Sequence, residues 1–143
     1  MFDAFRGKIR AIPRMRGILK SLRQRNIPIC VASQGPIREM EVTLGATGLK
    51  PLLEVRIYFA DAVARPKPAP DLFLRSARSE DAVPGACLMI ENSAKGDRAT
   101  VAAQIRVAGY DADANGDALA EAGANTIFSD MADLPALIWG TSP

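Results

Sequence analysis

The sequence predicts an α/β fold in which a mostly parallel sheet lies between helical layers, a three-layer Rossmann-like arrangement. Short apolar runs rich in Ile, Val and Ala alternate with stretches whose apolar residues recur at helical spacing. Strands that alternate with helices indicate βαβ units with right-handed crossovers. A chain of 143 residues has the length of one domain, so residues 1–143 are expected to form a single core.

Apolar spacing and turn residues define the elements of the first half of the chain. The first helix is predicted by apolar residues at positions i, i+3, i+4 and i+7, namely Met15, Ile18, Leu19 and Leu22. Pro13 suits the first turn of this helix, and Asn26 ends it. The elements that follow are a strand at 27–32, a helix at 37–44, a strand at 55–60 and a helix at 71–78.

The second half predicts three more strands, each followed by a helix. The apolar run 86–90 is a strand, and a polar loop at 91–96 separates it from a helix that ends near residue 103. The remaining elements are a strand at 105–109, a helix at 117–122, a strand at 125–128 and a closing helix at 131–138. Asn115 and Gly116 supply the turn before the helix at 117–122.

The absence of histidine excludes several classes of chemistry. It rules out Ser-His-Asp and Cys-His nucleophiles, and zinc sites or general bases built on imidazole. The two cysteines, Cys30 and Cys87, fall within predicted strands, so buried reduced thiols are a simpler interpretation than a disulfide. Any chemistry must therefore use carboxylate, lysine, hydroxyl or amide groups, with or without a metal ion.

Charge and hydropathy limit the partners of the chain. Residues 1–26 carry a net charge of +7 and residues 107–143 a net charge of −6. Aromatic residues that stack on bases are not interleaved with the basic segment, so charge pairing or a solvated helix face is preferred over nucleic-acid binding. No apolar stretch approaches the roughly 18 residues that span a bilayer, and the start does not resemble a secretory signal. A cytosolic protein without membrane attachment is expected.

A serine follows the first predicted strand at the edge where α/β sheets bind ligands. Ser33 stands before Gln34 and Gly35, and its hydroxyl and the nearby amides offer hydrogen bonds to a phosphate oxygen. Turn capping alone is the alternative explanation of this serine.

A lysine lies in a loop that three prolines stiffen. Pro66, Pro68 and Pro70 fix φ on both sides of Lys67. A lysine held in this way suits the neutralisation of phosphate. The alternative is a solvated lysine on a rigid surface loop.

Three oxygen-bearing residues close the strand at 86–90. Glu91, Asn92 and Ser93 offer a carboxylate, an amide and a hydroxyl, which are oxygen ligands suited to Mg²⁺. Asn92 is neutral, so this set attracts the ion less than two carboxylates would. Ser93 also suits the N-cap of the following helix.

In these motifs the chain resembles the haloacid dehalogenase superfamily, in particular its β-phosphoglucomutase-like phosphatases, from about residue 12 to 138. Residues 29–33 are similar to the second motif of the family, whose serine or threonine binds the transferring phosphoryl group. Lys67 matches the lysine of the third motif, which stabilises the phosphoaspartyl intermediate, and residues 89–96 match the acidic fourth motif, which holds Mg²⁺. The resemblance implies a phosphorylated small molecule as substrate and assigns roles to five residues. Ser33 and Lys67 would be catalytic, Ser33, Gln34 and Lys67 would bind phosphate, and Glu91 and Asn92 would bind Mg²⁺.

The sequence also departs from the family. Nothing in it matches the first motif, Asp-x-Asp-x-Thr on an N-terminal strand, and the segment 2–5 holds only Asp3 without an apolar run before it. The helical cap between the first two motifs is missing as well. Asn92 stands where a metal-binding aspartate is expected, and Gln104 stands where glycine is common. The prediction is therefore a haloacid dehalogenase core truncated on its N-terminal side, without its first, central strand and its cap.

The missing strand has a structural consequence. In this fold it lies between the strand ending at Ser33 and the strand ending at Glu91, so both would keep unpaired backbone groups on their inward edges. Direct pairing of the two strands, a strand from a second chain, or an exchange between protomers would satisfy these groups. Homo-oligomerisation or a strand-completing partner is the structural hypothesis.

Three functions follow from these observations. The first is a hydrolase of the phosphatase type, present in a truncated or degenerate form with low or no turnover, so enzymatic activity is left open. The second is a non-catalytic module that binds phosphate or serves as an oligomerising scaffold. The third, a nucleotide-binding Rossmann domain, is disfavoured because no Gly-x-Gly-x-x-Gly follows a predicted strand.

Overall fold

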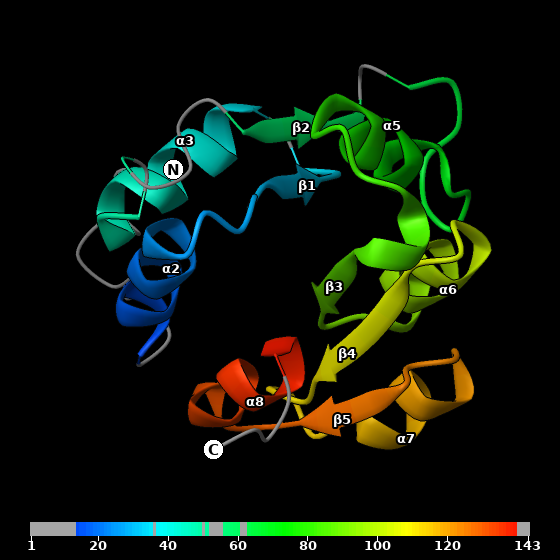
Figure 1. Cartoon of the computed structure of the whole chain (residues 1–143). Coiled ribbons are helices and arrows are strands. Elements are labelled where there is room, and N and C mark those ends of the chain that lie inside the picture. The colour runs from blue at the N-terminus through cyan, green and yellow to red at the C-terminus, as the bar shows by residue number, and fades with distance from the viewer. Residues whose placement is uncertain (1–13, 36, 50, 52–55, 61–62, 140–143) are drawn as a thin grey trace. The chain divides into compact units, whose positions relative to one another are not determined.

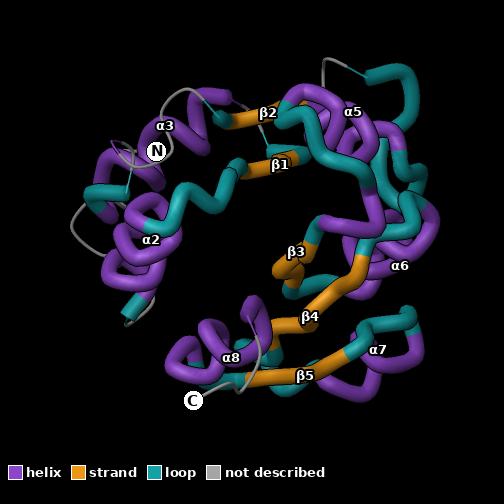
Figure 2. The backbone as a smooth tube through the Cα atoms, in the orientation of Figure 1, coloured by secondary structure: helices purple, strands orange, loops and turns teal. Residues whose placement is uncertain are grey.

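The structure, a computed structural model, describes residues 14–35, 37–49, 51, 56–60 and 63–139 (Figure 1). The chain divides into two compact units, Met1–Ala62 and Val63–Pro143. Each unit alternates helices with short parallel strands, which confirms the predicted α/β class (Figure 2). The organisation of residues 1–143 as one domain stays a prediction. The segment 2–5, which carries Asp3, and residue Val55 lie outside the described residues.

The first unit packs two helices against a pair of parallel strands. Its described elements are α2 (Met15–Gln24), β1 (Val31–Ser33), α3 (Ile37–Thr47) and β2 (Ile57–Phe59). The apolar spacing of α2 buries Ile18, Leu19 and Leu22, as predicted. Leu19 forms a core with Leu44 of α3 and with Leu49, and partly buried residues of both strands pack against it.

The predicted strand 27–32 is shorter and begins later than the sequence indicated. Only Val31–Ser33 pairs with β2, in the parallel register Val31 to Ile57 through Ser33 to Phe59. Pro28 has no backbone N–H to donate, and β2 has only three residues to pair with, so the ladder begins after the proline. Ser33 is therefore the last residue of the strand rather than the first residue of a turn.

The second unit contains a three-stranded parallel sheet in the order β3-β4-β5. Its helices and strands are α5 (Asp71–Ser79), β3 (Leu88–Glu91), α6 (Ala94–Ala102), β4 (Arg106–Tyr110), α7 (Gly116–Glu121), β5 (Thr126–Phe128) and α8 (Leu134–Trp139). Two single 3₁₀ turns, η2 (Pro84–Ala86) and η3 (Met131–Asp133), precede β3 and α8. The predicted strand 86–90 thus begins two residues later, because Ala86 belongs to η2.

The central strand of this sheet is its most buried one. Val107 and Ala108 of β4 are 0% and 2% exposed, whereas all four residues of β3 are half-buried. Helices α6 and α7 pack on β4, and α8 lies on the side of the strands away from them (Figure 1). Glu91, the last residue of β3, pairs in register with Gly109 of β4, so the carboxyl end of β3 lies at the rim of the sheet.

The pairing of β1 and β3 concerns the strand that the sequence was predicted to lack. Within the described residues, β1 pairs only with β2, and β3 pairs only with β4. In the same part of the chain, no helix is long and apolar enough to cross a membrane.

Candidate functional site

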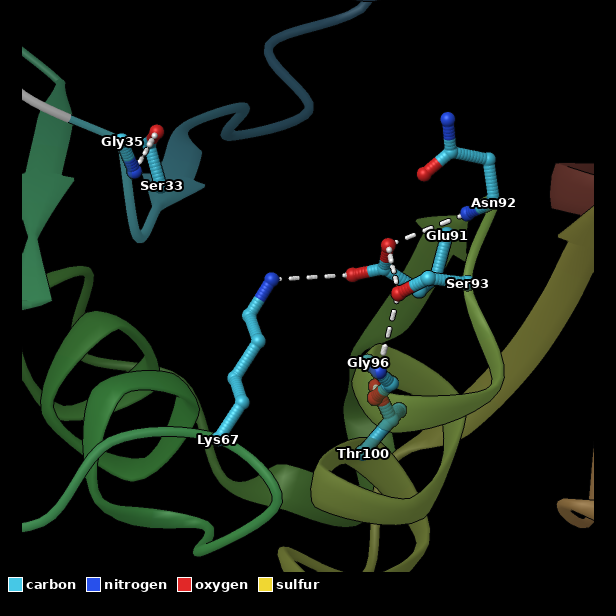
Figure 3. A network of polar contacts seen from close by, with 8 residues as sticks. All are labelled: Ser33, Gly35, Lys67, Glu91, Asn92, Ser93, Gly96 and Thr100. Carbon is cyan, nitrogen blue, oxygen red and sulfur yellow. Dashed lines mark hydrogen bonds and ion pairs between the residues drawn. The ribbon is translucent and has the colours of Figure 1, made fainter.

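Glu91 is the centre of a polar network at the carboxyl end of β3 (Figure 3). Its Oε1 accepts hydrogen bonds from the backbone N–H of Asn92, at 3.0 Å, and from the Ser93 hydroxyl, at 3.2 Å. Its Oε2 lies 3.1 Å from the Lys67 ammonium. The carboxylate thus accepts from three donors, two of them within the loop that follows its own strand.

Lys67 reaches Glu91 from the proline-rich loop before α5. Both side chains are only 11% exposed, so solvent screens this ion pair less than a surface pair. The Lys67 Nζ also lies 4.9 Å from the centroid of the Phe73 ring, whose face attracts a cation. The structure therefore holds the Lys67 ammonium between a carboxylate and an aromatic face rather than in solvent.

A second ion pair fixes the end of the same loop. The Arg65 guanidinium donates to both carboxylate oxygens of Asp71, the first residue of α5, with a shortest distance of 2.7 Å. The hydrogen bonds from Arg65 lower the pKa of Asp71, because they favour its ionised form. The Arg65 side chain is 69% exposed, so this pair orients the loop more than it stabilises the fold.

Helix α6 begins directly beneath the Glu91 side chain. The Ser93 hydroxyl accepts from the backbone N–H of Gly96 at 3.0 Å and thereby caps the helix, as its position suggested. This cap starts the helix at Ala94, three residues earlier than residue 97, which follows the predicted loop. A side chain at Gly96 would collide with the Glu91 carboxylate, so only glycine lets the two approach.

Asp97, in the first turn of α6, was not identified from the sequence. It is 0% exposed, and neither of its carboxylate oxygens has a hydrogen-bond partner within the described residues. Burial, reinforced by the negative charge of Glu91, raises the pKa of Asp97 to about 6. An aspartate near the start of a helix is usually an exposed acid that favours the helix dipole, so the sequence carried no signal of its burial.

Asn92 joins the loop after β3 to the loop after β4. Its carbonyl oxygen accepts from the Asn115 side-chain amide at 3.1 Å, while its own side chain is exposed. The Asn115 backbone N–H donates to Asp111 Oδ1 at 2.6 Å, which closes the second loop. These contacts fix the backbone around Asn92 without engaging its side-chain oxygen.

Ser33 and Gln34 belong to the other unit, at the end of β1. The Ser33 hydroxyl oxygen accepts from the backbone N–H of Gly35 at 3.1 Å, which is a local turn (Figure 3). The Gln34 side chain is half-buried. Of the five predicted site residues, the structure thus brings Lys67, Glu91 and Asn92 into one unit and describes Ser33 and Gln34 separately.

Comparison with known proteins identifies the family. The haloacid dehalogenase-like hydrolase family matches residues 3–104. The chain belongs to this family. The predicted resemblance to its phosphatase group is confirmed, since relatives and solved structures of that group match as well.

This haloacid dehalogenase-like chain matches part of two longer curated relatives. The bifunctional riboflavin kinase/FMN phosphatase of Arabidopsis thaliana is 32% identical over 108 residues, which are 75% of this chain and 28% of that protein. Protein CbbY of Rhodobacter capsulatus is 30% identical over 104 residues, 71% of this chain and 45% of that protein. The chain thus spans less than half the length of either relative.

Solved structures of the family agree with the fold. A haloacid dehalogenase-like protein of Agrobacterium tumefaciens, 31% identical, aligns with a TM-score of 0.86 over 96% of this chain and 64% of its own. A hydrolase of the same family from Deinococcus radiodurans, with bound phosphate and sodium, is 28% identical and has a TM-score of 0.84 over 90% of this chain and 58% of its own. A putative β-phosphoglucomutase of Thermotoga maritima, 27% identical, has a TM-score of 0.85 over 93% of this chain and 62% of its own.

The donors at the end of β3 suit a hard cation such as Mg²⁺. The described residues contain no group of three or more His, Cys, Asp or Glu side chains that could hold a metal. Mg²⁺, however, keeps several waters and commonly takes only one or two protein carboxylates. Glu91 supplies one such carboxylate, and the exposed side chain of Asn92 follows it directly, so the residues present fit the ion that the family implies.

The 143 residues contain one Asp-x-Asp sequence, Asp111-Ala112-Asp113, directly after β4. Asn follows at 115 where the first motif of the family has Thr. The Asp111 carboxylate accepts from the Asn115 backbone and so serves its own loop. This pair therefore does not replace the first motif.

Proposed function

We propose that this chain supplies the phosphate-holding and metal-holding residues of a phosphoryl-transfer site of the phosphatase type. One observation carries the proposal, namely the half-buried contact of 3.1 Å between Lys67 and Glu91 at the carboxyl end of β3. A lysine and a carboxylate from separate segments meet here in a member of the haloacid dehalogenase-like family, as its third and fourth motifs require. The FMN phosphatase among the relatives and the phosphate in a related structure support a phosphorylated small molecule as substrate.

Each residue has a distinct role in this proposal. Lys67 neutralises charge that develops on the phosphoryl oxygens, since its ammonium is a compact point charge. Ser33, the last residue of the segment that matches the second motif of the family, and Gln34 are proposed to bind phosphate through hydrogen bonds. Glu91, with the side-chain oxygen of Asn92, holds Mg²⁺, which when bound would neutralise the phosphate and orient it.

Turnover by residues 1–143 alone is expected to be low or absent. Phosphoryl transfer in this family needs an attacking aspartate, and no Asp-x-Asp-x-Thr is present in the sequence. The test is release of phosphate from p-nitrophenyl phosphate with and without Mg²⁺. Magnesium-dependent release that Lys67→Ala abolishes and Lys95→Ala preserves would contradict this expectation, because Lys95 is an exposed lysine of α6.

Binding tests the proposed site independently of turnover. Inorganic phosphate and Mg²⁺ together should raise the thermal unfolding midpoint, because both bind only the folded chain. Lys67→Ala should remove the shift that phosphate causes, whereas Lys95→Ala should keep it. No shift in the wild-type chain would favour the second function, a scaffold without a phosphate site.

The one-sided pairing of β1 and β3 supports an assembly role as the second candidate. Each of these strands has a single partner within the described residues, and unpaired strand edges readily add a further strand. A second copy of the chain or a strand-completing partner would satisfy them. Size-exclusion chromatography with light scattering should show a species larger than 15.3 kDa, and a monomer at all concentrations would contradict self-association.

A further inference from the structure

Asn115, between β4 and α7, has no role in the function proposed above. It occupies the N-cap position of α7, where an asparagine side chain usually accepts a hydrogen bond from a backbone N–H of the first turn. The Asn115 side chain makes no such bond. Its amide nitrogen instead donates to the carbonyl oxygen of Asn92, 23 residues earlier in the chain, at 3.1 Å. The side chain thus supports the loop after β3 rather than its own helix.

The segment around Asn115 is locally unfavourable in two further ways. The Asn115 Oδ1 is buried and has no hydrogen-bond partner among the residues that the structure describes. Ala114, the preceding residue, has a φ of 55°, in the left-handed region that residues with a Cβ seldom adopt. Strained backbone of this kind persists only where the surrounding structure imposes it, and it is concentrated at functional sites. The conformation of Asn115 is therefore set by its long-range contact and not by the preferences of its own segment.

The sheet holds Asn115 from the other side. The backbone N–H of Asp111 donates to the carbonyl oxygen of Phe128, the last residue of β5, at 2.8 Å. The Asp111 Oδ1 in turn accepts from the backbone N–H of Asn115 at 2.6 Å. Gly116 leaves room for this carboxylate, since a Cβ there would lie 2.9 Å from Asp111 Oδ2. A continuous series of hydrogen bonds therefore runs from β5 through Asp111 and Asn115 to Asn92.

Asn92 depends on this support more than its neighbours do. Lys67 holds the Glu91 side chain, and Ser93 is held as the cap of α6. The side chain of Asn92, in contrast, is exposed and projects from the loop (Figure 3). Among the described residues, the Asn115 amide is the one donor to the Asn92 carbonyl. Without it, the peptide plane between Asn92 and Ser93, and with it the direction of the Asn92 side chain, would no longer be fixed from this side.

We propose that Asn115 is a positioning residue, which fixes the Asn92 carbonyl and so orients the Asn92 side chain for ligand binding. The inference rests on the proposed function for the role of Asn92 and extends it by naming the residue that orients this side chain. A ligand group that is already oriented loses less side-chain entropy on binding, which matters most for a neutral amide. Asn115 itself touches neither the ion nor the phosphate in this proposal.

Mn²⁺ binding to the full chain, measured from the free ion by electron paramagnetic resonance, tests the inference without an enzymatic assay. The variant is Asn115→Ser, which keeps a good N-cap residue but is too short to reach the Asn92 carbonyl. The matched control is Asn125→Ser, because the Asn125 Oδ1 accepts from the backbone N–H of Val107 at 2.8 Å. Asn125 precedes β5 and so lies at the amino end of the parallel sheet, away from the end of β3.

Asn115→Ser should weaken Mn²⁺ binding by about tenfold or more, as loss of a partner of a metal ligand typically does, and Asn125→Ser should leave it unchanged. Asn92→Ala removes the oriented side chain and keeps the carbonyl, so adding Asn115→Ser to it should have no further effect. Equal weakening by Asn115→Ser in both backgrounds would overturn the inference, because Asn115 would then merely support the fold. Equal binding by the wild type and Asn115→Ser would overturn it too and leave the proposed function intact.

NMR relaxation of the metal-free chain tests the positioning itself. The Ser93 N–H shares a peptide plane with the Asn92 carbonyl, so its order parameter should fall from about 0.85 in the wild type to below about 0.6 in Asn115→Ser. Asn125→Ser should not change it, and an unchanged value in Asn115→Ser would overturn the inference. Absence of Mn²⁺ binding in the wild type would overturn the inference together with the metal role of Asn92. The phosphate-dependent shift that requires Lys67 would then still decide the rest of the proposed function.

Discussion

The polar residues at the ends of strands β1 and β3 are held by different kinds of contact. At the end of β3, Glu91 accepts from three donors, and Lys67 reaches it from a loop 24 residues away in sequence. At the end of β1, Ser33 contacts the backbone of its own turn at Gly35. One residue is held by the tertiary structure of its unit, and the other is held by the local chain alone.

This difference indicates which of the two groups of proposed site residues is preorganised. The Lys67–Glu91 pair is oriented before any ligand binds, so it does not lose side-chain entropy on binding. The Ser33 hydroxyl accepts one hydrogen bond and keeps its own hydrogen free for a phosphate oxygen. Substitutions at the end of β3 should therefore change stability, and Ser33→Ala should change phosphate binding with little effect on stability.

The largest effect is expected from Lys67→Met. This change leaves the Glu91 carboxylate 11% exposed without its cation, and breaking such a pair costs about 3 kcal/mol. Urea denaturation measures the loss as a lower midpoint. Arg65→Met is the control, because it breaks the exposed Arg65–Asp71 pair and should shift the midpoint little. Equal shifts for both variants would contradict a special role for the buried pair.

The next effect is expected from Gly96→Ala. The added methyl group meets the Glu91 carboxylate, so either Glu91 moves away from Lys67 or α6 shifts, at a cost of about 2 kcal/mol. Gly17→Ala, on an exposed position of α2 with open space around it, should instead stabilise the chain by roughly 0.5–1 kcal/mol. Chemical denaturation of the two variants compares the crowded end of β3 with an open helix of the first unit.

A smaller effect is expected from pH, measured in EDTA. The folded-state pKa of Asp97 is about 6, above its value of about 4 in an unfolded chain. The folded state therefore binds more protons between these values, so this contribution to stability is complete below pH 4 and is lost as pH rises through 6. The wild-type chain should lose this stability between pH 4 and 6, and Asp97→Asn should not, so the two pH–stability curves should diverge in this range. Parallel curves would show that Asp97 does not titrate in this range.

The smallest effect is expected at Gln104, between α6 and β4. Its φ of 62° lies in the left-handed region, which glycine adopts without strain, and glycine is common at this position in the family. Gln104→Gly should raise the free energy of unfolding by about 0.5–1 kcal/mol, because relief of strain exceeds the added entropy of the unfolded chain. Thermal denaturation detects this change. An unchanged or lower midpoint would show that the Gln104 side chain compensates the strain.

The sequence predicted the order and type of the elements because their signals are local. Apolar spacing predicted α2, and Ser33 and Glu91 were correctly expected at the ends of parallel strands. Boundaries were less accurate where pairing decides them, as in β1, which begins after Pro28 because the partner strand is short. The Lys67–Glu91 contact was expected from the family motifs, since neither residue predicts the other by spacing.

Asp97 could not be found in the same way. Its neighbours in sequence are a glycine and an arginine, which suggest an exposed helical turn. Its burial depends on the packing of α6 against β4 and on the Glu91 side chain that covers Gly96. Such properties come from tertiary contacts and leave no periodic pattern in the chain.

The Ser93 hydroxyl has a consequence for the binding of a phosphoryl group. Its oxygen accepts from Gly96, so its one hydrogen points to Glu91, and the three groups around Glu91 all act as donors. The Ser93 hydroxyl thus donates its hydrogen to Glu91 and caps α6 with its oxygen. It has no second hydrogen to give to a phosphoryl oxygen, so a donor to that group must come from another residue.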